Sequence, residues 1–202
     1  MAIQSHPVQD VPNARVVTGP GQAEPSERYD TTSIILHWLV AALVAALLIG
    51  GEAIEWFPEG RLRGDARSLH IALGMLLGLA VGVRFVWRLS FGRFLPPADA
   101  GVLGIAAKIA HRGFYALLGA MVLVGLLLLS VTGDSFFNHI SMPGNDPGDR
   151  SLADQLQNVH AIVGWIILAL VGLHIVAVLF HRYVLHDRVL DRMLPRHSAS
   201  GR

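Results

Sequence analysis

Cysteine is absent from this chain of 202 residues. Its absence excludes disulfide bonds, iron–sulfur clusters, thiolate zinc sites and covalently attached c-type haem. Charged residues are also scarce, at 15% of the chain, and a net charge of +1 gives no reason to expect nucleic acid as a partner. Any metal chemistry must therefore use histidine, of which the chain has 10.

Hydrophobic residues make up 52% of the chain and gather in four runs, at 34–51, 69–89, 113–133 and 159–180. Each run approaches or reaches the ~20 residues that a membrane helix needs. Because an open sheet leaves backbone polar groups unpaired in lipid, we predict an all-α integral membrane four-helix bundle. The expected division is a disordered tail over 1–30, a transmembrane domain over 31–185 and a basic tail over 186–202.

The distribution of lysine and arginine predicts the orientation of the bundle. Twelve of these residues lie in the two tails and the second connection, against four in the first and third connections. By the positive-inside rule both termini are expected in the cytoplasm of a bacterium, with the bundle in its inner membrane.

Four histidines occur at two depths of the predicted bundle. His37 lies near the cytoplasmic start of the first run, and His70 near the external start of the second. On the fourth run His160 is external, and His174 follows about 21 Å along the helix axis on nearly the same face. Depth therefore pairs His70 with His160 and His37 with His174. Two bis-histidine sites at different depths are what two non-covalent haems b require.

Other interpretations of these histidines stay open. Any one of them could be an interfacial or hydrogen-bonded side chain, and zinc or a proton path could use several, although ~21 Å is too far for one metal to bind all four. A stripe of glycines one turn apart suits either a flat macrocycle or ordinary packing between helices. The stripe consists of Gly74, Gly78 and Gly82 after His70, with Gly164 one turn after His160.

Short motifs extend from Arg28 to Pro195. They are Arg28-Tyr29 before Leu36-His37-Trp38, Leu69-His70 with Gly74, His111-x3-Tyr115 with Gly125, His160 with Gly164, Gly172-Leu173-His174 with His181, and Arg192-Met193-Leu194-Pro195. Through them the chain resembles the bacterial cytochrome b561 family, particularly its small members that act as superoxide oxidases. The resemblance implies that His37, His70, His160 and His174 are the haem ligands, paired as depth pairs them. The long N-terminal tail, and Val122 where many members carry proline, depart from the family without touching a ligand.

The resemblance implies electron transfer between haem b and quinone. The leading hypothesis is an oxidoreductase that oxidises external superoxide and reduces ubiquinone in the membrane. A second hypothesis is a cytochrome subunit that relays electrons between quinone and a partner hydrogenase or dehydrogenase, docked on the third connection (132–158), which holds His139 and four acids. A metal-ion transporter is less favoured, because the hydrophobic runs lack the acids that usually accompany cation sites.

Three arginines and three further side chains complete the predicted sites. Arg61, Arg63 and Arg67 precede His70 and could steer the superoxide anion, or could merely balance the acids of the same loop. His111 and Tyr115 are expected to contact the propionates of the inner haem, or to act only as interfacial anchors. His181, which shares a helical face with His174 and lies about 10.5 Å beyond it, is expected to bind quinone and relay a proton, or simply to end its helix.

Overall fold

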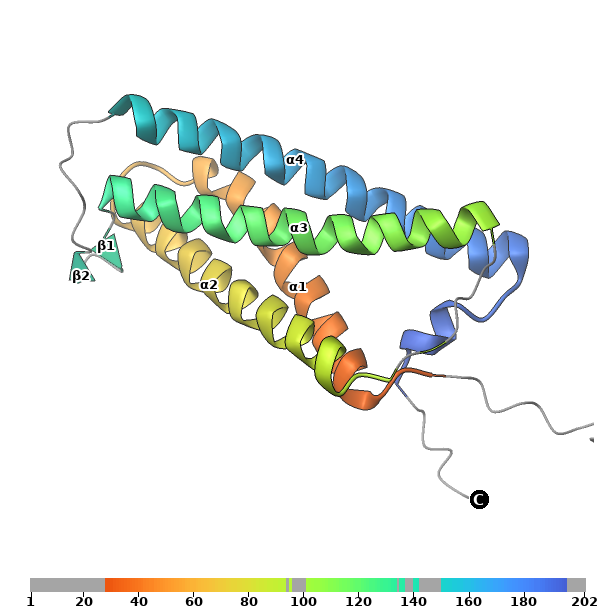
Figure 1. Ribbon diagram of the computed structural model, residues 1–202. Helices are drawn as coiled ribbons and strands as arrows, with labels where there is room; N and C mark the ends of the chain where they lie inside the picture. The colour runs from red at the N-terminus through yellow and green to blue at the C-terminus, as the bar shows by residue number, and fades with distance from the viewer. Residues whose placement is uncertain are drawn as a thin grey trace, which may run out of the picture.

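The computed structural model describes residues 28–93, 95, 101–133, 135–136, 140–141 and 150–195. The expected disordered tail before residue 28, the last residues of the basic tail and His139 lie outside the described residues. Four helices form the structure, α1 (Thr31–Ala53), α2 (Arg61–Ser90), α3 (Gly101–Thr132) and α4 (Arg150–Phe180) (Figure 1). All four are long and apolar enough to cross a membrane, which confirms the predicted all-α four-helix fold.

The helices are longer than the hydrophobic runs that predict them. Helix α2 begins at Arg61 rather than at Leu69, and α4 begins at Arg150 rather than at Val159. Outside the hydrocarbon the backbone can stay helical, since arginine, leucine, alanine and glutamine are all good helix formers. Hydrophobic length therefore locates the span within a helix but not the helix end.

Short elements join the helices. A 3-10 turn, η1 (Ile54–Trp56), follows α1, and a two-stranded antiparallel ribbon, β1 (Ser135–Phe136) with β2 (Ile140–Ser141), lies between α3 and α4. A π-helical turn, η2 (His181–Leu185), and a 3-10 turn, η3 (Leu190–Met193), follow α4. We call the end of the bundle with η1 and the ribbon the loop end, and the end with Asp30 and η2 the terminal end.

The helices pack mainly along the chain order. Helix α1 packs on α2, α2 on α3, and α3 on α4. Figure 1 shows the α1–α2 and α3–α4 pairs close together at the loop end and further apart at the terminal end. The buried core is small and aliphatic, with Leu43, Leu77, Leu118 and Ile167 among its members. Large apolar side chains on the outer faces are exposed, as expected of a surface covered by lipid.

Asp30 ties the start of α1 to the terminal end. Its carboxylate caps the helix by accepting from the backbone N–H and the hydroxyl of Ser33, at 2.8 and 2.7 Å. It also accepts from the indole N–H of Trp87 at 2.9 Å and from the backbone N–H of Arg93 at 3.2 Å. One carboxylate therefore joins α1 to the end of α2.

The C-terminal segment returns to the same place. The indole N–H of Trp38 donates to the carbonyl of Met193 at 2.8 Å, and the backbone N–H of Tyr29 donates to the carbonyl of Arg192 at 3.2 Å. Because Trp38 also packs edge-on against His37, with ring centroids 5.5 Å apart, the return of the chain braces a histidine of the candidate site.

Candidate functional site

At the terminal half of the bundle, His37 of α1 faces His174 of α4. Their ring centroids are 6.5 Å apart and their planes are inclined by 64°. Phe114 and His111 of α3 stand edge-on to His174, at 5.6 and 6.2 Å between centroids. Aromatic rings from α1 and α3 thus cluster around His174 of α4.

At the loop half, His70 of α2 faces His160 of α4 with nearly the same geometry. Their ring centroids are 6.2 Å apart and the planes are inclined by 66°. The structure therefore brings together the two pairs that depth along the helices predicts, and α4 contributes one member to each. The two pairs stand in different halves of the bundle.

Two glycines that the predicted site did not include lie behind the second pair. A Cβ built on Gly51 of α1 would stand 3.2 Å from Cε1 of His70, and one built on Gly125 of α3 would stand 3.4 Å from Cε1 of His160. Each ring thus packs edge-on against the bare backbone of a neighbouring helix. Gly125 occurs among the motifs of the sequence, but nothing local to Gly51 distinguishes it from Gly50.

The glycines of the α2 stripe differ in their surroundings: Gly78 allows close packing between helices, whereas Gly74 and Gly82 face open space. A Cβ on Gly78 would lie 2.9 Å from Val122 of α3, so this glycine permits close helix packing. Gly164 likewise faces Met121. Gly74 and Gly82 have no atom within 4 Å of such a Cβ, and Gly82 instead lines a cavity between α2 and α3.

The donor sets fit haem better than a bare metal ion. Two imidazoles that bind one iron from opposite sides at about 2 Å each have ring centroids roughly 6 Å apart, close to the separations observed. Within the described part of the chain no group of three or more histidine or acidic side chains could hold a metal ion. A haem b would take its two protein ligands from one such pair, since its porphyrin supplies the other iron ligands.

Burial of the ring nitrogens agrees with this fit. The Nδ1 atoms of His70 and His160 are buried and have no hydrogen-bond partner among the residues that the structure describes. A buried polar atom without a partner costs on the order of 1–3 kcal/mol, so the fold does not place these rings by hydrogen bonding. Binding of iron by these imidazoles would explain why two such polar rings are buried inside the bundle.

Tyr115 lies apart from the histidine pairs in the described contacts. Its ring packs edge-on against Phe85 of α2 at 5.6 Å between centroids. Both rings line an apolar cavity of about 480 Å³ between α2 and α3, together with Gly82 and Gly119. Of the two residues expected beside the inner haem, the structure thus brings only His111 into ring contact with a predicted ligand.

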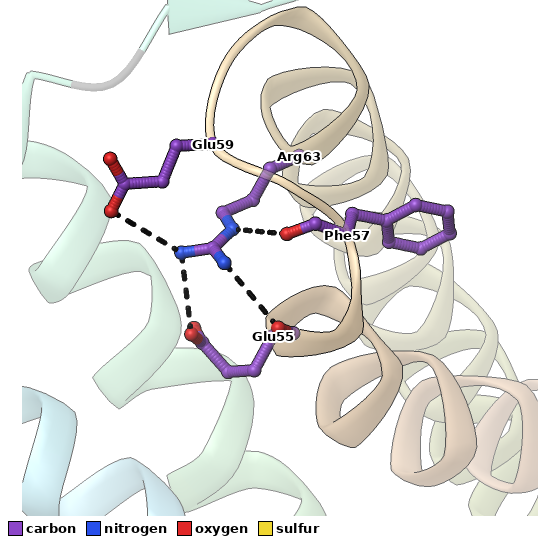
Figure 2. Close-up of polar contacts among 4 residues, drawn as sticks. All are labelled: Glu55, Phe57, Glu59 and Arg63. Atoms are coloured by element: carbon purple, nitrogen blue, oxygen red, sulfur yellow. Dashed lines mark hydrogen bonds and ion pairs between the residues drawn. The ribbon is translucent and has the colours of Figure 1, made fainter.

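Two of the three arginines, Arg61 and Arg63, lie in the first turn of α2 and pair with nearby acids. Arg63 donates through Nε to the carbonyl of Phe57 at 2.9 Å, and its Nη1 lies 3.5 Å from Glu55 and 3.9 Å from Glu59 (Figure 2). Arg61 pairs with Asp65 at 3.7 Å and is 86% exposed. These ion pairs balance charge at the start of α2, which lies at the same end of the bundle as His70 and His160.

His181 stands at the start of the π-helical turn, next to an acid that the predicted site did not include. Its Nδ1 lies 2.5 Å from a carboxylate oxygen of Asp187. Burial alone would raise the pKa of Asp187, but hydrogen bonds from His181 and from the backbone N–H of Val189 hold that pKa below its usual value. Asp187 is therefore ionised at neutral pH.

Comparison with known proteins identifies the family of this chain. Residues 28–196 match the family model described as prokaryotic cytochrome b561. The match takes in all four helices and all four paired histidines.

Individual relatives are similar over most of their length. The "Probable superoxide oxidase CybB" of Yersinia pestis is 28% identical over 175 residues, which cover 84% of this chain and 97% of the relative. The "Cytochrome b561 homolog 1" of Escherichia coli K12 is 30% identical over 183 residues, covering 84% and 98%. The "Cytochrome b562" of Cereibacter sphaeroides is 31% identical over 167 residues, covering 82% and 94%. The chain belongs to the prokaryotic cytochrome b561 family, and it is a membrane electron-transfer protein of the haem b type.

Proposed function

We propose that this chain is an oxidoreductase with two haems b that oxidises superoxide at the loop end and reduces ubiquinone at the terminal end. The observation that supports it most is the presence of two imidazole pairs of nearly equal geometry in opposite halves of one bundle. His70 and His160 would hold one haem, and His37 and His174 the other. When bound, haem b supplies one-electron transfer.

The reaction fixes what the chain must do at each end. Two superoxide anions each lose one electron and leave as dioxygen, while one ubiquinone gains two electrons and two protons and leaves as ubiquinol. At the loop end Arg61, Arg63 and Arg67 contribute positive charge toward an incoming anion. At the terminal end His181 supplies a proton donor at the edge of the membrane.

The family relationship supports the substrate assignment through one relative, which is named a probable superoxide oxidase and shares 28% identity. Among the chain's own features, the absence of acids from the hydrophobic runs is compatible with a reaction that needs no carboxylate near the first haem.

The proposed orientation places the loop end outside the inner membrane and both termini in the cytoplasm, following the excess of lysine and arginine at the terminal end. Reporter fusions at Arg202 and within the first connection test it. Only the C-terminal fusion should be active with a cytoplasmic reporter.

His111 is proposed as a neighbour of the inner haem, because its ring lies 6.2 Å from that of His174. Replacing His111 by alanine should shift the midpoint potential of that haem while the other keeps its own. Tyr115 packs on Phe85 rather than on a paired histidine. Tyr115→Phe is therefore expected to leave both midpoint potentials near those of the parent.

The decisive experiment is a reduced-minus-oxidised spectrum of the purified protein, quantified against protein concentration, followed by superoxide-driven reduction of ubiquinone in liposomes. Two haems b per chain and quinol formation by the isolated chain are expected. Haem b without superoxide activity, together with a second protein in the native mass spectrum, would instead identify a subunit that relays electrons to a hydrogenase or dehydrogenase.

A further inference from the structure

The chain reverses sharply just beyond α4. The π-helical turn His181–Leu185 ends at His186, whose φ of 55° places it in the left-handed region. The backbone N–H of Asp187 then donates to the carbonyl of His181 at 3.1 Å. Histidine tolerates the left-handed region better than most residues, and π-turns are frequent at functional sites. The reversal returns Asp187 to the side chain of His181, six positions earlier.

Both oxygens of Asp187 are used in this turn. One lies 2.5 Å from Nδ1 of His181, and the other accepts from the backbone N–H of Val189 at 3.0 Å. An ionised carboxylate can only accept hydrogen bonds, so Nδ1 of His181 carries a proton. The carboxylate itself is held in place by the backbone beyond it.

We propose that Asp187 is the positioning residue of a His181–Asp187 proton-transfer pair that serves quinone reduction at the terminal end. This inference rests on the proposed function. The carboxylate keeps a proton on Nδ1 and orients the ring, so that Nε2 is the nitrogen from which a proton passes to a quinone oxygen. Each ubiquinone takes two electrons, one from each of two superoxide anions oxidised at the loop end, and two protons. His181 passes on one proton at a time, so water reprotonates it between the first and the second transfer.

The surroundings of the pair suit such a path. The His181 side chain is 14% exposed, whereas that of Asp187 is 32% exposed, so the acid is the member nearer to water. Phe180 packs edge-on against His181, and exposed Val184 lies in the same turn, which gives the pair an apolar flank at the membrane edge. The charged groups acting on Asp187 are His181 itself and Arg192 of η3. Both groups favour the ionised form of the carboxylate.

Four variants of the full haem-loaded protein test the pair. Asp187→Asn keeps the shape but weakens the acceptor, Asp187→Glu keeps the charge, and His181→Ala removes the proton donor. Asp191→Asn is the matched control, since Asp191 lies in the same segment and only its backbone carbonyl takes part in a described hydrogen bond. Each protein is reduced with dithionite, mixed with a short-chain ubiquinone, and followed by haem absorbance in H₂O and D₂O.

Asp187→Asn is expected to slow reoxidation by at least tenfold with an altered solvent isotope effect, because outer groups that orient a histidine typically contribute about 10–100-fold. Asp187→Glu should recover most of the rate, and Asp191→Asn should match the parent. The His181→Ala/Asp187→Asn double variant should be no slower than His181→Ala alone, because the acid acts through the ring. Parent-like reoxidation of Asp187→Asn would overturn the proposal, as would additive losses in the double variant.

A second measurement separates this inference from the proposed function. In protein labelled with ¹⁵N-histidine, the His181 signals should report a proton on Nδ1 in the parent and in Asp191→Asn, and should change in Asp187→Asn. A His181 ring protonated only at Nε2 in the parent would overturn the pair whatever the substrate. Failure of the parent to be reoxidised by any quinone, with the Nδ1 proton present, would instead overturn the proposed function.

Discussion

Gly51 of α1 lies directly against the imidazole of His70 of α2. A Cβ at Gly51 would stand 3.2 Å from Cε1 and 3.6 Å from Nδ1 of that ring. Ordinary carbon contacts lie at about 3.5–4.0 Å, so the ring occupies space that any side chain at residue 51 would contest. The adjacent Gly50 has no atom within 4 Å of such a Cβ. Two neighbouring glycines therefore differ completely in what they permit.

Gly51→Val should reduce occupancy of the haem that we propose for His70 and His160, whereas Gly50→Val should leave the haem content of the parent unchanged. Overpacking costs about 1–3 kcal/mol, and each 1.4 kcal/mol is tenfold in affinity. Haem content at limiting haem, measured by absorbance, distinguishes the variants. Equal haem content in the two valine variants would contradict this prediction, because it would show that the His70 ring can shift without loss of haem. A Cβ at Gly125 would stand 3.4 Å from Cε1 of His160. Gly125→Val should therefore also lower haem occupancy, by less than Gly51→Val.

Alanine substitutions test the histidine pairing. His37→Ala and His174→Ala should remove the same haem and spare the other, because their rings face each other. His70→Ala and His160→Ala should remove the second haem. Potentiometric titration of each variant identifies the haem that remains. Loss of one common haem in His37→Ala and His160→Ala would mean that the pairing is wrong.

Charge at the loop end is expected to govern the encounter with superoxide. Changing Arg61, Arg63 and Arg67 together to glutamine should lower the second-order rate by roughly tenfold at low salt and flatten its dependence on ionic strength. Lys108→Gln, at the other end of the bundle, is the control for loss of positive charge. If the triple variant keeps its haem and its kinetics, the arginines only balance nearby acids, as Arg63 does with Glu55 and Glu59 in Figure 2.

Asp30 should make the terminal end sensitive to acid. Burial alone would raise its pKa, but hydrogen bonds from Ser33, Trp87 and Arg93 lower it from 3.8 to about 2. A pKa depressed in the folded state contributes stability above the unfolded value, and that contribution is lost as pH falls from about 4 through about 2. Thermal unfolding in detergent at several pH values should show this loss in the parent.

Asp30→Ala should lower stability at neutral pH by roughly 1–2 kcal/mol, the usual contribution of an N-cap residue, and should weaken the dependence of stability on pH between about 4 and 2. For a chain of this size the shift in Tm is expected to be a few degrees. Asp30→Asn can still cap the helix but carries no charge, so it should retain more stability than alanine. Identical acid profiles for the parent and Asp30→Ala would show that Asp30 contributes nothing to the acid sensitivity.

The sequence by itself determined the four spans and the depth of each histidine. Hydrophobic length and helical rise are local properties, so the run at 159–180 already places His160 and His174 about 21 Å apart on one face. The absence of cysteine alone excludes every thiolate-ligated metal centre. Helix ends were not determined in this way, because polar residues such as Arg61 and Arg150 continue a helix in water without any hydrophobic signal.

Only the tertiary structure decided which groups stand beside the histidines. Gly51 meets His70, and the carbonyl of Met193 accepts from Trp38, through contacts between separate elements whose angle and register arise from packing. Asp187 reaches His181 because a π-helical turn and one left-handed residue reverse the chain. Spacing along the sequence cannot reveal such contacts, because they depend on how the backbone bends and on which helix faces meet.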